Sequence, residues 1–170
     1  PGADPKLEEP RYDLGAIALK EGDTKEAIGE LQSALKIVRT DSDALYLMGV
    51  ALLKEGRVQP AIDSLNHAIL FVPTGWCEPY SQLNLAYGKL GNAPRATYSG
   101  AMADVCHKKP IDAKRKLNTL TTGPAQLDAL LELGLIAQTE SKNSEAISWY
   151  QKVLTVDRTN AIAIGAMSRL

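Results

Sequence analysis

The stretches LGAIALKEG at 14–22 and MGVALLKEG at 48–56 decide the fold. They carry the same residue at five matching places and lie 34 residues apart. A second signal follows each stretch at the same displacement, namely Ala27-x3-Leu31-x2-Ala34 and Ala61-x3-Leu65-x2-Ala68. A fixed period of this length is the sequence signature of a repeat protein, in which each unit buries its apolar face against the next.

The series continues in two further places, with departures. LNLAYGKLG at 83–91 follows after one extra residue and has Asn84 where the first two stretches have Gly. LGLIA at 133–137 opens a fourth match, whose turn carries Ser141 in place of Gly. The spacing of the second signals is kept at 96–103 and 146–153, although Gly100 replaces the bulky residue in the first of them. Four matches indicate one array.

Each unit is predicted to be a pair of helices. Leu45, Met48 and Leu52 follow the spacing of an apolar helix stripe. Gly22 and Gly56 are placed to end the first helix in a left-handed cap. The alanine that follows each turn lets the second helix approach the first closely, and Pro73 is expected to stop the second hairpin.

This pattern resembles the tetratricopeptide repeat family over most of the chain. The resemblance implies an all-α fold, an α-α superhelix in which antiparallel helical hairpins form a solenoid. We expect a single domain over 1–170. Its predicted parts are units at about 8–41, 42–76 and 77–110, an irregular helix at 111–126, a unit at 127–160 and a terminal helix at 161–170.

The period breaks between the third and fourth matches, so we expect irregular structure near 108–126. The surplus contains Ala113-x3-Leu117-x2-Leu120, which is itself like a second-helix signal. Either a short helix packs across the stack before Gly123-Pro124 restarts the pattern, or one helix at about 93–107 serves two overlapping hairpins. Likewise, the helix at 161–170 either caps the array or begins a further unit.

Composition and motifs indicate no catalytic site. Lys plus Arg number 19 and Asp plus Glu number 20, so no positive field favours nucleic acid as the partner. No apolar stretch is long enough to span a bilayer, so this segment is not expected to insert into a membrane. His107 follows Cys106, but these two and Cys77 lack the paired short spacing of a zinc site. We predict no catalytic residue, no metal and no cofactor.

Within the family, first helices line a concave groove that holds a partner. The resemblance therefore places a protein or peptide partner against an apolar or aromatic central row and a basic row, with an acidic row at Glu9, Asp43, Glu78 and Asp128. The candidate groove residues are Tyr12, Ala16, Lys20, Tyr46, Val50, Lys54, Leu85, Lys89, Leu131 and Leu135.

Two observations refine this groove. Family members that grip chaperone C-termini use Asn where this chain has Ala16, Val50 and Leu85, so an extended or helical peptide with an apolar face fits better. Tyr12 and Tyr46, as large amphipathic side chains without an expected core role, are candidate anchors. The basic row has a plainer interpretation, a solvated face that merely follows the repeat.

The predicted function is a non-catalytic scaffold or adaptor for protein–protein interaction. The alternative is a self-assembly module of a larger, membrane-anchored protein, in which terminal helices stack between copies to form a homo-oligomer. An enzyme would need a catalytic domain outside this segment. The chain begins at Pro1 without an initiator Met, so we expect sequence upstream.

Cys77 and Cys106 are the two cysteines of the chain. They are residues one and thirty of the third unit, which lie opposite each other at the open end of an antiparallel hairpin. A disulfide needs Cα atoms roughly 4.4 to 6.8 Å apart, and such a hairpin end can provide that distance. A bridge indicates an extracytoplasmic or membrane-tethered location; two free, half-buried thiols would indicate a cytoplasmic scaffold.

Thiol titration distinguishes these two states. If the disulfide hypothesis holds, the unfolded, unreduced protein shows no reactive thiol and prior reduction exposes both. Two free thiols before reduction would remove the disulfide hypothesis, and with it the argument for an oxidising compartment.

Overall fold

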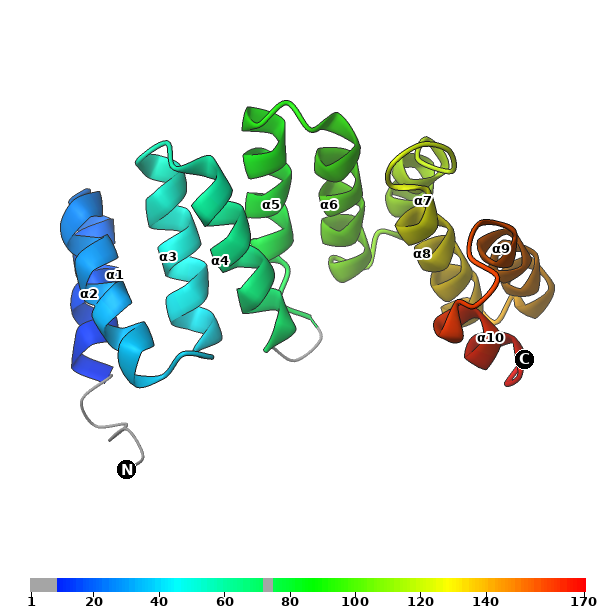
Figure 1. The fold of residues 1–170 in the computed structure, drawn as a ribbon, viewed down its shortest axis with the longest axis horizontal. Coiled ribbons are helices and arrows are strands. Elements are labelled where there is room, and N and C mark those ends of the chain that lie inside the picture. The colour runs from blue at the N-terminus through cyan, green and yellow to red at the C-terminus, as the bar shows by residue number, and fades with distance from the viewer. Residues whose placement is uncertain (1–8, 72–74) are drawn as a thin grey trace. The chain divides into compact units, whose positions relative to one another are not determined.

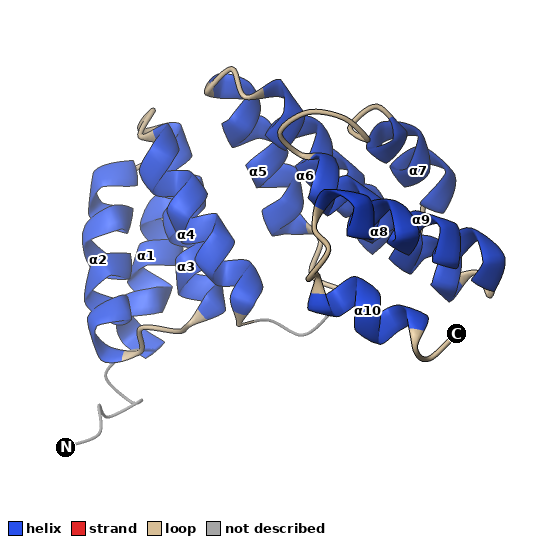
Figure 2. Ribbon diagram, turned by 45° about the vertical axis from the view of Figure 1, so that its right-hand side comes forward, coloured by secondary structure: helices blue, strands red, loops and turns tan. Residues whose placement is uncertain are grey.

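The computed structural model describes residues 9–71 and 75–170. Over these residues the chain forms ten helices and no strand (Figure 1, Figure 2). The predicted all-α fold is therefore confirmed. The chain divides into two compact units, residues 1–92 and 93–170, which are described in turn.

The first unit contains five helices joined by short connections. They are α1 (Glu9–Glu21), α2 (Thr24–Ile37), α3 (Ser42–Lys54), α4 (Val58–Leu70) and α5 (Glu78–Lys89). Helix α1 packs against α2 and α3 against α4, which makes two hairpins, and the contacts of α2 with α3 and of α4 with α5 stack them. One continuous cluster of buried aliphatic and alanine side chains fills the space between these helices.

A glycine at the centre of each first helix lets the paired helices approach closely. A Cβ atom built on Gly15 would lie 2.7 Å from Cγ of Leu31, and one on Gly49 would lie 2.6 Å from Cγ of Leu65. Both leucines have no exposed surface. A methyl group does not fit into such a close-packed contact, so glycine is needed here for space.

The turns explain where the helices end. Gly22 and Gly56 have φ values of +92° and +76°, a conformation that L side chains resist. Asp23 then begins α2, and its side chain accepts a hydrogen bond of 3.0 Å from the backbone N–H of Glu26. Asp41 caps α3 in the same way through the N–H of Ala44. Pro73, the predicted stop of the second hairpin, lies outside the described residues.

The second unit also contains five helices. They are α6 (Ala93–Cys106), α7 (Pro110–Asn118), α8 (Gln126–Thr139), α9 (Asn143–Val156) and α10 (Ala161–Met167). Helix α6 packs against α7, α7 against α8, α8 against α9 and α9 against α10. Two buried clusters form its core, one beneath α6, α7 and α8 and one beneath α8, α9 and α10.

The α8–α9 hairpin repeats the glycine contact with a larger partner. A Cβ atom on Gly134 would lie 2.5 Å from Cε1 of Tyr150, a fully buried side chain whose hydroxyl donates a hydrogen bond of 3.0 Å to Gln138. The turn departs from the pattern, because Ser141 adopts φ +59° where the earlier turns use glycine. The same backbone shape is thus reached with a residue that resists it.

Helix α7 occupies the region where irregular structure is expected. It is nine residues long and contributes Ala113 and Leu117 to the core. It packs against α6 on one side and against α8 on the other. The division of the chain into repeat units stays a prediction.

Gly49→Ala and Gly29→Ala together test the close helix approach. Gly29 lies inside α2 with nothing within 4 Å of the position of its missing Cβ. We expect Gly49→Ala to destabilise the fold by about 1–3 kcal/mol through overpacking. Gly29→Ala should instead gain up to about 1 kcal/mol from helix propensity. Chemical unfolding of both variants measures this; equal effects would show that space at Gly49 is not limiting.

Candidate partner-binding surface

The candidate groove residues of the first unit lie on three neighbouring helices. Helix α3 contacts both α1 and α5, so the first helices of successive hairpins are adjacent. Equivalent residues recur along them, one set on each helix. The sets are Tyr12, Ala16 and Lys20 on α1, Tyr46, Val50 and Lys54 on α3, and Leu85 and Lys89 on α5.

The central row changes from half-buried to exposed along these helices. Ala16 and Val50 are half-buried, and Val50 also packs against the core. Leu85 has 49% of its surface exposed, which is high for a large aliphatic side chain. An exposed apolar side chain beside half-buried ones is the surface that an apolar partner segment would cover.

The two tyrosines have a packing role that the sequence analysis did not assign to them. Tyr12 and Tyr46 are half-buried and pack against the core of the first unit. The ring of Tyr46 also meets Trp76 edge to face, with ring centroids 4.9 Å apart. Burial raises the pKa of Tyr46, the charge of Glu78 acts in the same direction, and a hydrogen bond with Gln82 opposes them. Truncating Tyr46 would therefore cost stability as well as any partner contact.

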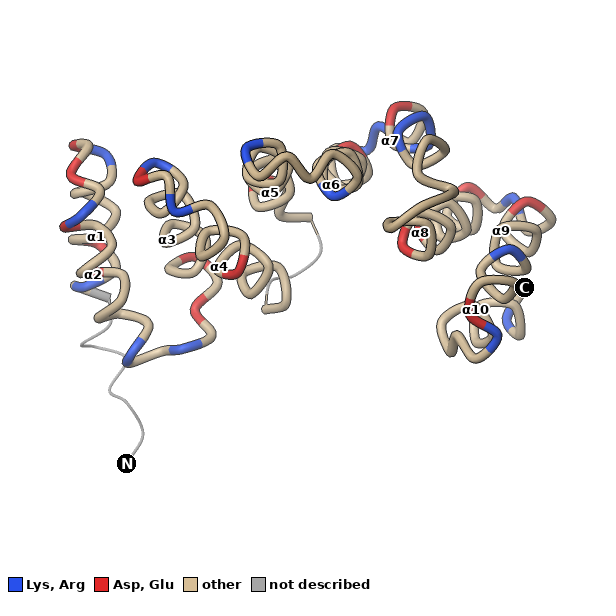
Figure 3. Tube along the Cα trace, turned by 45° about the horizontal axis from the view of Figure 1, so that its top comes forward, with Lys and Arg blue, Asp and Glu red and all other residues tan. Residues whose placement is uncertain are grey.

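The basic row lies at the C-terminal ends of its helices. Lys20, Lys54 and Lys89 each occupy the last turn and are exposed. None of the three forms an ion pair with another residue in 9–71 or 75–170. Their charges complement the helix dipole, which gives them a local role, and their ammonium groups remain open to a partner. Figure 3 shows Lys and Arg in blue along both units.

In the second unit, Leu131 and Leu135 lie one turn apart on α8. Leu131 is half-buried against the core, whereas 38% of the surface of Leu135 is exposed. The same helix carries Asp128 of the predicted acidic row, and Arg95 on α6 pairs with it at 2.8 Å. This carboxylate is thus already engaged within the unit.

Glu132, one turn after Asp128, has an unusual environment. It accepts a hydrogen bond of 3.5 Å from the hydroxyl of Tyr98. Burial raises the pKa of Glu132, the hydrogen bond from Tyr98 lowers it, and the charge of Asp128 raises it further, so that the net change is upward. Burial of a charge with one long hydrogen bond disfavours the ionised form.

Sequence reasoning missed Trp76, Tyr98 and Glu132. The contact of Trp76 with Tyr46 depends on the chain just before α5, where no periodic signal exists. Tyr98 and Glu132 are 34 residues apart, which is one repeat period. Arg95 and Asp128 are 33 residues apart, one residue less than the period. That spacing can be read from the sequence, and it indicates that the two side chains of each pair lie at matching places on equivalent helices.

Few other sites for chemistry are present. In the part of the chain that the structure describes, no group of three or more His, Cys, Asp or Glu side chains could hold a metal ion. Nor does any helix there combine the length and the apolar character needed to cross a bilayer. Neither cysteine is a free thiol. The pairing of Cys77 with Cys106 stays a prediction.

These features define an all-α protein built from stacked helical hairpins, a class typical of protein-interaction scaffolds. Two models of the tetratricopeptide repeat match the sequence, at residues 18–82 and 127–160, and together they span more than half of it. The chain belongs to the tetratricopeptide repeat family. No curated protein sequence shows significant similarity to it.

Solved structures agree with this fold. A crystal structure of MamA protein is 21% identical with a TM-score of 0.54, covering 95% of this chain and 79% of that one. A second crystal structure of MamA is 26% identical, with a TM-score of 0.53 and coverage of 94% and 83%. A chain in the crystal structure of the APC/C hetero-tetramer Cut9–Hcn1 is 18% identical, has a TM-score of 0.55, and is matched over 95% of this chain but 29% of its own length.

Glu132→Gln tests the electrostatics of α8. Since the folded-state pKa is raised, protonated Glu132 favours folding below the unfolded-state pKa, and this contribution is lost as pH rises through the folded-state pKa. Glutamine keeps the acceptor for Tyr98 without the charge. We therefore expect a higher thermal midpoint than wild type at pH 7, with the difference vanishing below about pH 4.

Thermal unfolding monitored by circular dichroism at pH 4, 5.5 and 7 measures this effect. Asp13→Asn, which removes an exposed carboxylate on α1, is the matched control and should show no comparable pH dependence. A Glu132→Gln variant that is less stable than wild type at pH 7 would contradict the inference.

Proposed function

We propose that this protein is a non-catalytic scaffold that binds a segment of a partner polypeptide across α1, α3 and α5. The observation that carries the proposal is the recurrence of Lys20, Lys54 and Lys89 at equivalent places on adjacent helices, each exposed and without an ion pair to any described residue. The more apolar row of Ala16, Val50 and Leu85 lies one turn before these lysines on the same helices.

The arrangement favours a partner segment with an apolar face flanked by acidic residues. Burying Leu85 would remove its exposed apolar surface from water, which favours association. Acidic groups on the partner would pair with the lysines and fix its register, which contributes to specificity and to the rate of association. Leu131 and Leu135 on α8 offer a similar row in the second unit, and we propose that it contributes to partner binding as well.

A non-catalytic role is supported by what the structure brings together. The candidate groove residues of the first unit are aliphatic, aromatic and lysine side chains, with the carboxylates of Asp43 and Glu78 in the first turns of α3 and α5. The raised pKa of Tyr46 follows from burial in a packed contact, which does not indicate an acid–base role. The charged side chains at the helix ends would attract a partner and orient it.

Two variants test the groove against a captured partner. The first is Lys20→Glu, Lys54→Glu and Lys89→Glu combined; the second is Leu85→Asp alone. Affinity capture with the wild-type protein identifies the partner, and titration with the purified partner then gives affinities. We expect the triple charge reversal to weaken binding by about tenfold or more, because attraction becomes repulsion at three places. Leu85→Asp should also weaken partner binding, because it places a charge in the apolar row.

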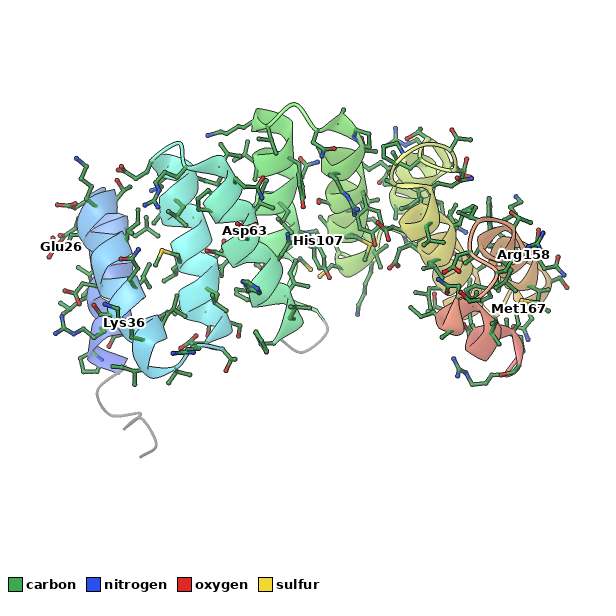
Figure 4. All side chains as sticks on the ribbon, in the orientation of Figure 1. Glu26, Lys36, Asp63, His107, Arg158 and Met167 are labelled. Atoms are coloured by element: carbon green, nitrogen blue, oxygen red, sulfur yellow. The ribbon has the colours of Figure 1, made fainter. Side chains whose placement is uncertain are left out.

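The matched control reverses three exposed cations of the same unit that lie off the first helices. Lys25 and Lys36 are on α2, where Figure 4 labels Lys36, and Arg57 precedes α4. This variant has the same net charge as the triple groove variant and should keep wild-type affinity. Equal losses in both would indicate general charge attraction and would move the site away from the groove.

Self-assembly is the second candidate function, and a specific observation favours it. Helix α1 exposes 49% of Leu14 and 52% of Ile17, and α10 exposes 57% of Ile162 and 50% of Ile164. Apolar surface of this kind on terminal helices suits stacking between copies. Light scattering of the wild-type and groove variants over a concentration series separates the two functions: a mass above that of one chain, unchanged by the groove variants, favours self-assembly.

A further inference from the structure

A pocket of about 450 Å³ opens in the second unit between α7, α8 and α9. Its volume lies within the range of small-ligand sites. Leu130 on α8 is buried and forms an apolar part of the lining, and Trp149 on α9 is half-buried. The polar part of the lining includes Asn118, Thr121, Gln126 and Lys152.

The short length of α7 accounts for the position of this pocket. Helix α7 ends at Asn118 after nine residues, whereas α9 continues for fourteen. The chain from 119 to 125 is not helical, so α7 supplies only its last residue, Asn118, to the lining, and Thr121 comes from the non-helical stretch. The pocket lies where this stretch meets α8 and α9, because Asn118 and Thr121 share its lining with residues of both helices.

Lys152 is the sole charged side chain lining the pocket, all of whose residues are described. Its ammonium nitrogen lies 3.8 Å from the centre of the Trp149 ring, and this cation–π contact positions the charge at the pocket. No carboxylate in the described part of the chain lies within ion-pair distance of it. Glu145, the nearest acid along α9, accepts a hydrogen bond from the indole N–H at 3.5 Å.

The remaining polar groups show which donors are available. Asn118 donates its side-chain amide to Lys114, Thr121 donates its hydroxyl to the carbonyl of Asn118, and Trp149 is engaged by Glu145. The ammonium of Lys152 and the side-chain amide of Gln126 are the nitrogen donors of the lining that form no hydrogen bond within the described chain. Two open donors, one of them charged, fit a single carboxylate.

We propose that this pocket binds the carboxylate of an Asp or Glu side chain of a partner polypeptide. Lys152 supplies an ion pair and Gln126 a hydrogen bond, while Leu130 and the Trp149 ring contact the aliphatic part of the side chain. One positive charge matches one carboxylate; a phosphate dianion would leave charge uncompensated. The site is separate from the proposed groove, because Gln126 and Leu130 share one face of α8 and Leu131 and Leu135 share another.

Chemical-shift titration of the indole N–H of Trp149 tests the proposal on the complete chain. Comparison with Trp149→Phe identifies its signal beside that of Trp76. The probes are the pentapeptide Gly-Ser-Glu-Ser-Gly, its glutamine counterpart, N-acetylglutamate and inorganic phosphate. We expect a saturable shift with the glutamate peptide at a Kd on the order of 1 mM, and none with the glutamine peptide.

Three variants connect the shift to the pocket. Lys152→Gln should weaken binding about tenfold, since a charged hydrogen bond is lost. Gln126→Glu, which places a carboxylate beside Lys152, should abolish binding. Arg158→Gln is the matched control, an exposed cation just after α9, labelled in Figure 4, that does not line the pocket and should bind as wild type does.

Each other outcome would overturn the proposal. Equal shifts with the glutamate and glutamine peptides would show that charge is not recognised. A saturable shift with N-acetylglutamate or phosphate, but none with the glutamate peptide, would make the pocket a site for small anions. Unchanged affinity in Lys152→Gln would place the binding elsewhere. Failure of these titrations would leave the groove of the first unit unaffected, because no residue is common to both.

Discussion

The close approach of two helices at a glycine is the contact on which the rest of the structure depends. Gly15, Gly49 and Gly134 each face a fully buried large side chain sixteen residues later, with no space for a methyl group between them. That contact fixes both the distance between paired helices and their register. Since a single hairpin leaves its other apolar faces uncovered, fixed hairpins can bury them only by stacking.

The same contact explains why the turn can vary while the hairpin does not. Gly22 and Gly56 supply the left-handed residue that ends their first helices, yet Ser141 adopts the same backbone shape in the α8–α9 hairpin. The strain of one serine in this conformation, on the order of 1 kcal/mol, is small beside the packing of the fully buried Tyr150 against Gly134. Interhelical packing therefore determines the turn in this hairpin.

The sequence predicted the helices well because spacing and glycine turns are local signals. Leu45, Met48 and Leu52 are buried on α3 as their stripe predicts. It could not assign the packing of Tyr46, because the partner ring of Trp76 precedes α5 in a segment without periodicity. The end of α7 at Asn118 could not be predicted either, since the irregular helix was expected to continue to 126.

Regular positions and departures from the repeat contribute differently to function. Positions that face the paired helix are committed to packing, so glycine or alanine there carries no information about a partner. Exposed positions that recur, such as Lys20, Lys54 and Lys89, lie outside the core and can change with the partner. Where the regular pattern breaks after α7, Asn118 and Thr121 line a pocket together with Trp149 and Lys152 of α9. Their spacing of three residues on one helix face is visible in the sequence, but the pocket beside them depends on how the irregular stretch at 119–125 lies against α8 and α9.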